Sequence, residues 1–269
     1  MTEPTPGSDY KLDQFERNET RTMPIATYGF LAIVAVNFGV QAWLGLDSVP
    51  ATIRLGVLDQ SLVLQGEWWR VMAAATLHGG VQHVLFNSFV LFVLGSALER
   101  LIGSQRLLVL LFASIIGGAM LSLVTLNYNM SLGASGGLWG VLAAHAILAF
   151  HPGGLIPKSM VRGARVAALI NLGLNVAVSF MPNVDWAAHL GGFIVGGLLF
   201  YFVLRKGLPH FDSQTQSSVH PRVASGPITA CAVVLGTAFV ASLACVWILG
   251  RPFEIAATPS FKPHRDQIL

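Results

Sequence analysis

The chain has 269 residues, of which 54% are hydrophobic and 11% are charged, with a formal net charge of +3. A soluble domain usually carries about a quarter charged residues, spread over its surface, so this composition excludes an ordinary soluble protein. Eight of the charged residues lie among the first 23 positions, and the others leave seven long uncharged stretches. The sequence therefore predicts an all-α polytopic membrane protein.

The composition also argues against other classes of protein. The chain has no basic run interleaved with aromatic residues, so no nucleic-acid surface is predicted. Cys231 and Cys245 lie in one apolar stretch, and we expect no disulfide framework, metal site or cofactor. The first 23 residues hold five acidic and three basic side chains, which is not the pattern of a cleaved signal or transit peptide.

Seven apolar stretches follow one another along the chain. A bilayer core of about 30 Å takes about 20 helical residues. The first, third and seventh stretches reach this length and the sixth is close, whereas the second, fourth and fifth have 17, 16 and 16 residues. We expect the second to begin earlier, near Gly79. The expected spans are Pro24–Leu46, Gln82–Leu98, Leu107–Leu126, Ser135–Phe150, Val166–Met181, Trp186–Leu204 and Pro227–Leu249.

Between the spans, two connections stand out. Residues 47–81 are long and contain short apolar pieces, so we expect them to lie partly in the outer leaflet or against the helices. No internal repeat is visible, which argues against a transporter built from inverted halves. The predicted division is a cytoplasmic tail (1–23), a six-helix body (24–205), a cytoplasmic linker rich in Ser, Gln and His (206–226), a seventh helix (227–249) and an outer tail (250–269).

The distribution of Lys and Arg predicts the orientation. With the N-terminus inside, eleven basic residues lie on the inner side and five on the outer side. The sequence thus predicts seven helices with an N-in, C-out topology, and a bacterial inner membrane is the expected location. It does not indicate an oligomeric state.

Polar residues inside the spans are the candidates for chemistry, because they are costly in a membrane. In this topology the second, fourth and sixth spans all run from outside to inside. Their outer ends carry His83 and Asn87, then Ser135, then His189. A hydroxyl, two imidazoles and an amide are therefore expected at a similar depth.

This set of side chains is typical of nucleophilic catalysis. A serine becomes a nucleophile when a neighbouring histidine takes its proton, and His189 is the candidate base for Ser135. Attack on an amide creates a negative oxygen that needs preorganised donors. His83 and Asn87 share one helix face, and the Ser135 backbone N–H lies at a helix N-terminus. No acidic residue accompanies them at that depth, which favours a dyad over a triad.

Helix length and glycine spacing support this interpretation. Sixteen residues span only about 24 Å, so Ser135 is expected below the outer surface, with residues 128–134 as irregular backbone beside a wet cavity. The pairs Gly136/Gly140 and Gly192/Gly196 predict a close approach of the fourth and sixth spans.

Four motifs together give the sequence a specific resemblance. They are Glu67-Trp68-Trp69-Arg70, His83-Val84-Leu85-Phe86-Asn87, Gly133-Ala134-Ser135-Gly136, and Ala188-His189-Leu190-Gly191-Gly192 with Gly196. In this order the chain resembles a rhomboid intramembrane serine protease from about Pro24 to Arg205. The extra helix is similar to that of members with six helices plus one.

The resemblance implies a function and a set of site residues. It implies cleavage of transmembrane segments of other proteins near the outer leaflet, with small residues favoured at the cut site. Ser135 and His189 would be the catalytic dyad, and His83, Asn87 and the Ser135 N–H the oxyanion hole. Trp69 and Arg70 match a structural pair of the outer loop, and His78 matches a buried structural histidine. Trp139 stands where the family often has tyrosine, and from Ser135 + 4 it could stack on His189.

The sequence leaves other functions open, and other roles for several polar residues. The chain could be a non-catalytic relative that binds membrane helices as a chaperone, or a solute transporter. A metal site of His78, His83 and His189 is disfavoured because no HExxH-type helix is present. His145, about 15 Å beyond Ser135, is expected to pack. Asp185 is either an orienting group for His189 or, by preference, a solvated loop residue. Asn37, Asn171 and Asn175 could bond across helices and are assigned no chemistry.

Overall fold

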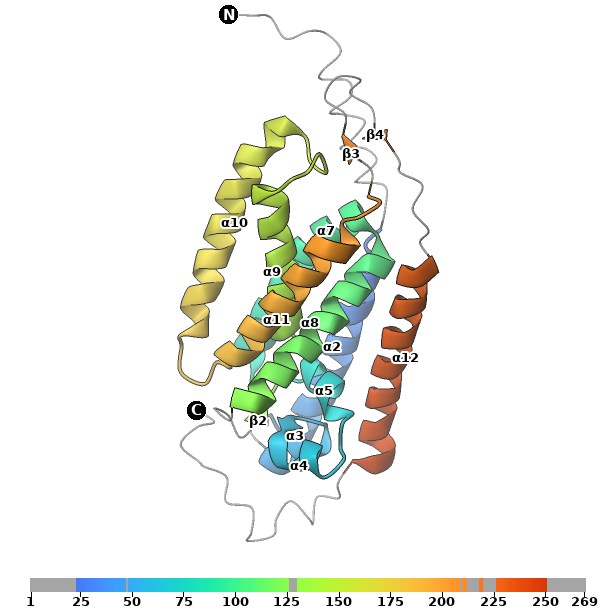
Figure 1. Ribbon diagram of the computed structural model, residues 1–269. Coiled ribbons are helices and arrows are strands. Elements are labelled where there is room, and N and C mark those ends of the chain that lie inside the picture. Colours follow the sequence, from blue (N-terminus) through green and yellow to red (C-terminus); the bar gives the residue numbers. More distant parts are fainter. Residues whose placement is uncertain are drawn as a thin grey trace, which may run out of the picture.

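A computed structural model shows a helical bundle with two short strand pairs (Figure 1). The structure describes residues 23–46, 48–125, 130–208, 210–211, 218–219 and 226–250. Almost all of the two predicted tails, most of the predicted linker, and residues 126–129 before the fourth span lie outside these residues. Among the described residues, six helices are long and apolar enough to cross a membrane, and a seventh apolar helix is shorter.

The helices follow the predicted stretches closely. The first is α2 (Ile25–Leu44), and the second joins α6 (Val81–Val90), a π-helical turn η2 (Leu91–Gly95) and α7 (Ser96–Ile102). The others are α8 (Ser104–Thr125), α9 (Ser135–Phe150), α10 (Lys158–Ser179), α11 (Trp186–Leu199) with a π-helical turn η3 (Phe200–Leu204), and α12 (Gly226–Leu249). The second span begins at Val81, one residue before the uncharged stretch and two after the expected Gly79, and it extends further at its other end, to Ile102.

The fifth span differs most from its prediction. Helix α10 begins at Lys158, not at Val166, and its first two turns contain Arg162 and Arg165. The predicted span was defined as an uncharged stretch, so it began after these arginines. Lys and Arg are nevertheless good helix formers whose long side chains reach the membrane surface from the end of a span.

The connection between α2 and α6 folds into short elements at one end of the bundle (Figure 1). They are α3 (Val49–Arg54), β1 (Leu58–Asp59), α4 (Gln60–Leu64), α5 (Arg70–Ala73) and the 3-10 turn η1 (Ala74–Thr76). Strand β1 pairs antiparallel with β2 (Met130–Ser131) ahead of α9, and α5 contacts α8 and α12. The prediction that this connection lies against the helices is confirmed. A second pair, β3 (His210–Phe211) and β4 (Ser218–Val219), lies between α11 and α12 in the chain.

Polar side chains of α2 hold the connection in place. Asn37 donates from Nδ2 to Thr76 Oγ1 at 2.7 Å. Gln41 donates to the His78 carbonyl at 2.7 Å and accepts from the His78 N–H at 3.1 Å. By contrast, Asn171 and Asn175 donate to carbonyls of their own helix, and not across to another helix.

Helices α8, α9 and α11 form the tightest part of the bundle. A Cβ on Gly192 would overlap the Gly136 carbonyl oxygen, and one on Gly196 would lie 2.5 Å from Gly140 Cα. A Cβ on Gly118 of α8 would lie 2.6 Å from the Ala188 oxygen. The backbones are therefore in direct contact, as small-residue packing in membranes allows. The predicted approach of the fourth and sixth spans is confirmed, and α8 is a third partner.

At the opposite end of the bundle, a buried carboxylate caps α2. Glu99 accepts from the N–H groups of Ala26 and Thr27 at 2.8 Å, from Thr27 Oγ1 at 2.7 Å and from Ser104 Oγ at 2.6 Å. These four bonds compensate for burying the charge beside a helix N-terminus. Nearby, His145 Nε2 lies 3.0 Å from the Leu94 carbonyl oxygen in the π-helical turn, so His145 has a structural contact away from Ser135.

Candidate active site

The candidate residues gather at the end of the bundle that carries the α2–α6 connection. Helix α6 starts after Gly80, α9 starts at Ser135, and α11 starts at Trp186. Gly133, two residues before Ser135, has a φ of +121°, a conformation that L side chains rarely adopt. This turn aims the chain into α9.

His83 and Asn87 of α6 lie against this turn. A Cβ on Gly133 would be 2.9 Å from His83 Cε1 and Nε2 and 3.5 Å from Asn87 Nδ2. Two side chains spaced four residues apart on one helix thus meet the backbone just ahead of Ser135. A side chain at position 133 would displace the His83 ring.

The side chains of His83 and Asn87 differ in their hydrogen bonds. The Gly79 N–H donates to His83 Nδ1 at 3.3 Å, so a neutral His83 ring carries its proton on Nε2, the atom nearest Gly133. Asn87 Nδ2 is buried and has no hydrogen-bond partner among the described residues. A buried donor without a partner costs about 1–3 kcal/mol, which suggests a ligand atom that is absent from the free protein.

His189 is buried at the start of α11. Its imidazole stacks on the indole of Trp139, with ring centroids 5.4 Å apart and planes at 28°. Trp139 in turn meets Phe193 edge to face at 5.9 Å. His189 Nδ1 lies 2.6 Å from Ser179 Oγ of α10. No hydrogen bond joins Ser135 to His189 in the part of the chain that the structure describes; such bonds often tighten only when substrate is bound.

The segment that contains these residues is similar to known proteins. A family model described as Rhomboid domain matches residues 65–206. The chain belongs to the rhomboid family of intramembrane proteases. It is 35% identical over 187 residues to the rhomboid protease GluP of Bacillus subtilis (strain 168), covering 69% of this chain and 36% of GluP. It is 34% identical over 194 residues to YdcA of the same organism, covering 69% of this chain and 92% of YdcA.

A third relative is the rhomboid protease AarA of Providencia stuartii, 31% identical over 179 residues that cover 57% of this chain and 63% of AarA. The chain therefore spans less than two thirds of GluP and of AarA. The family and the apolar helices together make the chain a multi-pass integral membrane protein.

Asp185 of this rhomboid lies in the connection between α10 and α11, as predicted, but its carboxylate has protein partners. Its Oδ1 accepts from the Ala188 N–H at 3.0 Å and caps α11, and its Oδ2 accepts from Ser122 Oγ of α8 at 2.5 Å. Asp185 is a half-buried loop residue rather than a merely solvated one, because a helix start beside α8 offers both oxygens a donor. Asp185 ties α11 to α8 at the depth of the site.

His78 is fully buried in the loop before α6, outside the candidate membrane spans. Its ring meets the His83 ring edge to face, with centroids 5.0 Å apart. Burial, with a smaller effect from His83, lowers the pKa of His78 to about 3, so the ring is neutral at physiological pH. The described residues contain no cluster of three His, Cys, Asp or Glu that would hold a metal ion.

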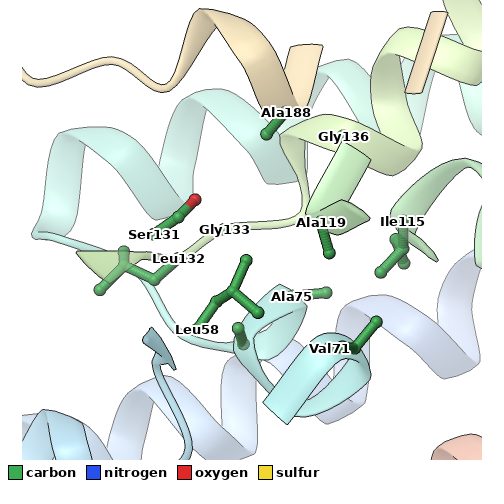
Figure 2. A pocket seen from close by; sticks show the side chains of 11 residues that line it. Leu58, Val71, Ala75, Ile115, Ala119, Ser131, Leu132, Gly133, Gly136 and Ala188 are labelled. Atoms are coloured by element: carbon green, nitrogen blue, oxygen red, sulfur yellow. The ribbon is translucent and has the colours of Figure 1, made fainter. Parts of the chain in front are cut away.

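A small cavity opens next to the Ser135 turn (Figure 2). Its walls come from the α2–α6 connection, from α8, from both sides of Ser135 and from the start of α11, and apart from Ser131 they are built of small or apolar residues. These are Leu58, Val71, Ala74, Ala75, Ile115, Ala119, Ser131, Leu132, Gly133, Gly136 and Ala188. The sequence predicts a cavity beside this turn but not the residues that line it, because they are far apart in the chain and only Ser131 among them has a polar side chain.

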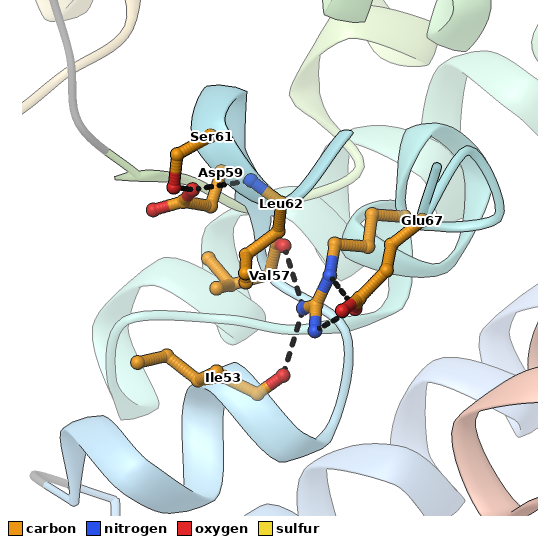
Figure 3. Close-up of polar contacts among 7 residues, drawn as sticks. Ile53, Val57, Asp59, Ser61, Leu62 and Glu67 are labelled. Atoms are coloured by element: carbon orange, nitrogen blue, oxygen red, sulfur yellow. Dashed lines mark hydrogen bonds and ion pairs between the residues drawn. The ribbon is translucent and has the colours of Figure 1, made fainter. Parts of the chain in front are cut away.

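Trp69 and Arg70 lie behind this cavity, in the connection itself. The fully buried Arg70 pairs with Glu67 at 2.6 Å and donates to the carbonyls of Ile53 at 2.7 Å and Val57 at 3.1 Å (Figure 3). Its guanidinium lies 4.5 Å from the centroid of the Trp69 ring. One cation thus satisfies backbone carbonyls of a loop that has no regular ladder of its own.

Proposed function

We propose that this rhomboid is a serine endopeptidase that cleaves transmembrane segments of membrane proteins near the outer leaflet. The observation that carries the proposal is the pair of donors, His83 Nε2 and Asn87 Nδ2, beside the Gly133 backbone at the start of α9. Ser135 begins that helix, and Trp139, one turn further, supports the ring of His189.

In the proposed reaction, Ser135 Oγ attacks the substrate carbonyl carbon while His189 takes the hydroxyl proton. The carbonyl oxygen becomes negative and accepts hydrogen bonds from His83, Asn87 and the Ser135 N–H at the start of α9. The imidazolium then protonates the amine as the C–N bond breaks. A water molecule, activated by the same imidazole, hydrolyses the acyl ester and restores Ser135.

The cavity of Figure 2 is the proposed place for a substrate side chain. It borders Gly133 and Gly136, which flank Ser135, so a side chain next to the cut bond would reach it. Its alanine and glycine walls favour a small apolar side chain, and a charged one would find no counter-charge among these residues.

We further propose that Trp69, Arg70 and His78 have structural roles, and that Gly133, Gly192 and Gly196 are required for close backbone packing. The support is the set of buried contacts described above. These residues would shape the site without touching the substrate.

The proposed topology keeps the predicted seven crossings, with the N-terminus inside and the C-terminus outside. Helix α9 has only 16 residues, but it is buried between α8 and α11 and does not need to match the bilayer alone. The end that carries α3 to α5 would face outward. The excess of Lys and Arg on the other side supports a bacterial inner membrane as the location.

The test is cleavage of a single-span membrane protein in mild detergent by wild type, Ser135→Ala and Ser159→Ala. Ser159 is exposed near the start of α10, far along that helix from the site, and is the matched control. We expect wild type and Ser159→Ala to cleave, and Ser135→Ala to stay folded and inactive. Cleavage by Ser135→Ala would contradict the assignment of the nucleophile. Inactivity of folded wild type towards a panel of single-span proteins would favour the non-catalytic helix-binding alternative.

A further inference from the structure

We propose that Ser179, at the end of α10, is a positioning residue that sets the tautomer of His189, given the protease function proposed above. It would do in this site what a carboxylate does in a triad. The sequence alone does not indicate this role for Ser179, because Ser179 belongs to a different helix and lies ten residues before His189.

The geometry around the Ser179 hydroxyl gives a direction to its bonds. Ser179 Oγ lies 2.6 Å from His189 Nδ1 and 2.9 Å from the Asn175 carbonyl oxygen. A hydroxyl has one hydrogen, and the carbonyl can only accept. Because the Ser179 hydroxyl donates its hydrogen to the Asn175 carbonyl, its oxygen is left to accept a hydrogen bond from the Nδ1–H of His189.

This chain of two hydrogen bonds decides the chemistry of the ring. A neutral imidazole with its proton on Nδ1 has a lone pair on Nε2, which is the form that takes a proton from serine. The opposite tautomer would present an N–H on Nε2 and would be unable to act as the base. The bond to Ser179 therefore selects the reactive form.

The surroundings explain why a hydroxyl has this role. Asp185 is the nearest acidic residue in the chain, and its two oxygens are used by the Ala188 N–H and Ser122 Oγ. Asn175, whose carbonyl accepts the Ser179 hydrogen, is the one buried residue of α10, and Ser179 itself is half-buried. Stacking on Trp139 fixes the plane of the His189 imidazole, and the hydrogen bond to Ser179 fixes the direction of Nδ1 within that plane.

The kinetic test compares wild type with Ser179→Ala, Ser179→Thr and the control Ser159→Ala on one single-span substrate. We expect Ser179→Ala to lower kcat about tenfold with KM unchanged, because a free imidazole still populates both tautomers, whereas enforcing the wrong one costs about 10⁴-fold. Ser179→Thr keeps the hydroxyl and is expected to stay within about twofold of wild type, as is Ser159→Ala.

A second readout reports the tautomer itself. In ¹⁵N-histidine-labelled protein, with His189→Gln used to assign the signal, wild type is expected to show His189 protonated on Nδ1 and Ser179→Ala a mixture of tautomers. Unchanged kcat and an unchanged ¹⁵N pattern in Ser179→Ala would overturn the proposal, and so would a loss of kcat that Ser179→Thr does not restore. An inactive wild type would contradict the protease function, and the ¹⁵N pattern would still test Ser179.

Discussion

Helices α9 and α10 are neighbours in the chain and in the bundle, yet they are packed in opposite ways (Figure 1). Eleven of the 16 residues of α9 are buried, whereas α10 has one buried residue, Asn175, among 22. Helix α9 is enclosed by α8 and α11, and α10 packs mainly against α9. Both helices contain glycines, but those of α9 lie against neighbouring helices, whereas Gly163 and Gly173 of α10 have no atom of another helix within 4 Å of a Cβ position. The enclosed helix is thus the one whose glycines face its neighbours.

The largest expected effect breaks the enclosed side of this comparison. In Gly192→Ala the new Cβ would overlap the Gly136 carbonyl, so we expect a loss of about 3 kcal/mol of stability and of nearly all proteolysis. The matched change Gly173→Ala on α10 meets nothing within 4 Å and is expected to be neutral or slightly stabilising. Thermal unfolding in detergent measures both. Equal losses of stability in Gly192→Ala and Gly173→Ala would contradict the proposed difference in packing between the enclosed helices and α10.

Removing an oxyanion donor leaves the packing intact and tests the chemistry of the site. Asn87→Ala is expected to lower kcat by about 10²–10³-fold with little change in KM or in unfolding temperature, because its Nδ2 has no hydrogen-bond partner among the residues that the structure describes. Gln82→Ala, on the exposed start of the same helix, is the control. A change in KM alone would assign Asn87 to substrate binding instead.

His78 provides a pH-dependent test of the loop side of the site. Because burial lowers its pKa from 6.5 to about 3, the unfolded chain binds more protons than the folded one below pH 6.5, and stability falls as the pH falls. We expect this residue to contribute a loss of about 2 kcal/mol between pH 6.5 and about pH 5. In His78→Phe the fall in unfolding free energy over this range is expected to be smaller by that amount. An equally steep fall in the variant would contradict the role of His78.

The smallest expected effect concerns the cavity beside Ser135. Ala119→Leu narrows it from the α8 side, and we expect kcat/KM for a substrate with leucine next to the cut to fall about tenfold relative to one with alanine. Competition between the two substrates in one reaction measures the ratio directly. An unchanged ratio would place the substrate side chain elsewhere.

The sequence predicts those parts of the molecule that depend on local spacing. The bounds of α9 are as predicted, because Gly133 and His151-Pro152 mark both of its ends. His83 and Asn87 lie against the Ser135 turn because four residues make one turn of helix. The close approach of Gly136 and Gly192 follows from small residues at a spacing of four.

Other contacts depend on how distant segments meet, and these the sequence does not reveal. The pairing of Asp185 with Ser122 joins residues 63 positions apart, and Ser179 reaches His189 only because α10 and α11 meet at a tight turn. The start of α10 was misplaced because charge marks the membrane surface and not the end of a helix. The cavity is lined by residues without a distinctive side chain, so only the fold assembles it.

Labelling with a serine-directed fluorophosphonate, mapped by mass spectrometry, tests the central claim most directly. The claim is that His189 activates Ser135 at the start of the enclosed helix α9. We predict that folded wild type is modified at Ser135 and that His189→Ala is not modified, while both show the same unfolding temperature. Modification of a different serine, or equal labelling of Ser135 in the two proteins, would contradict the claim.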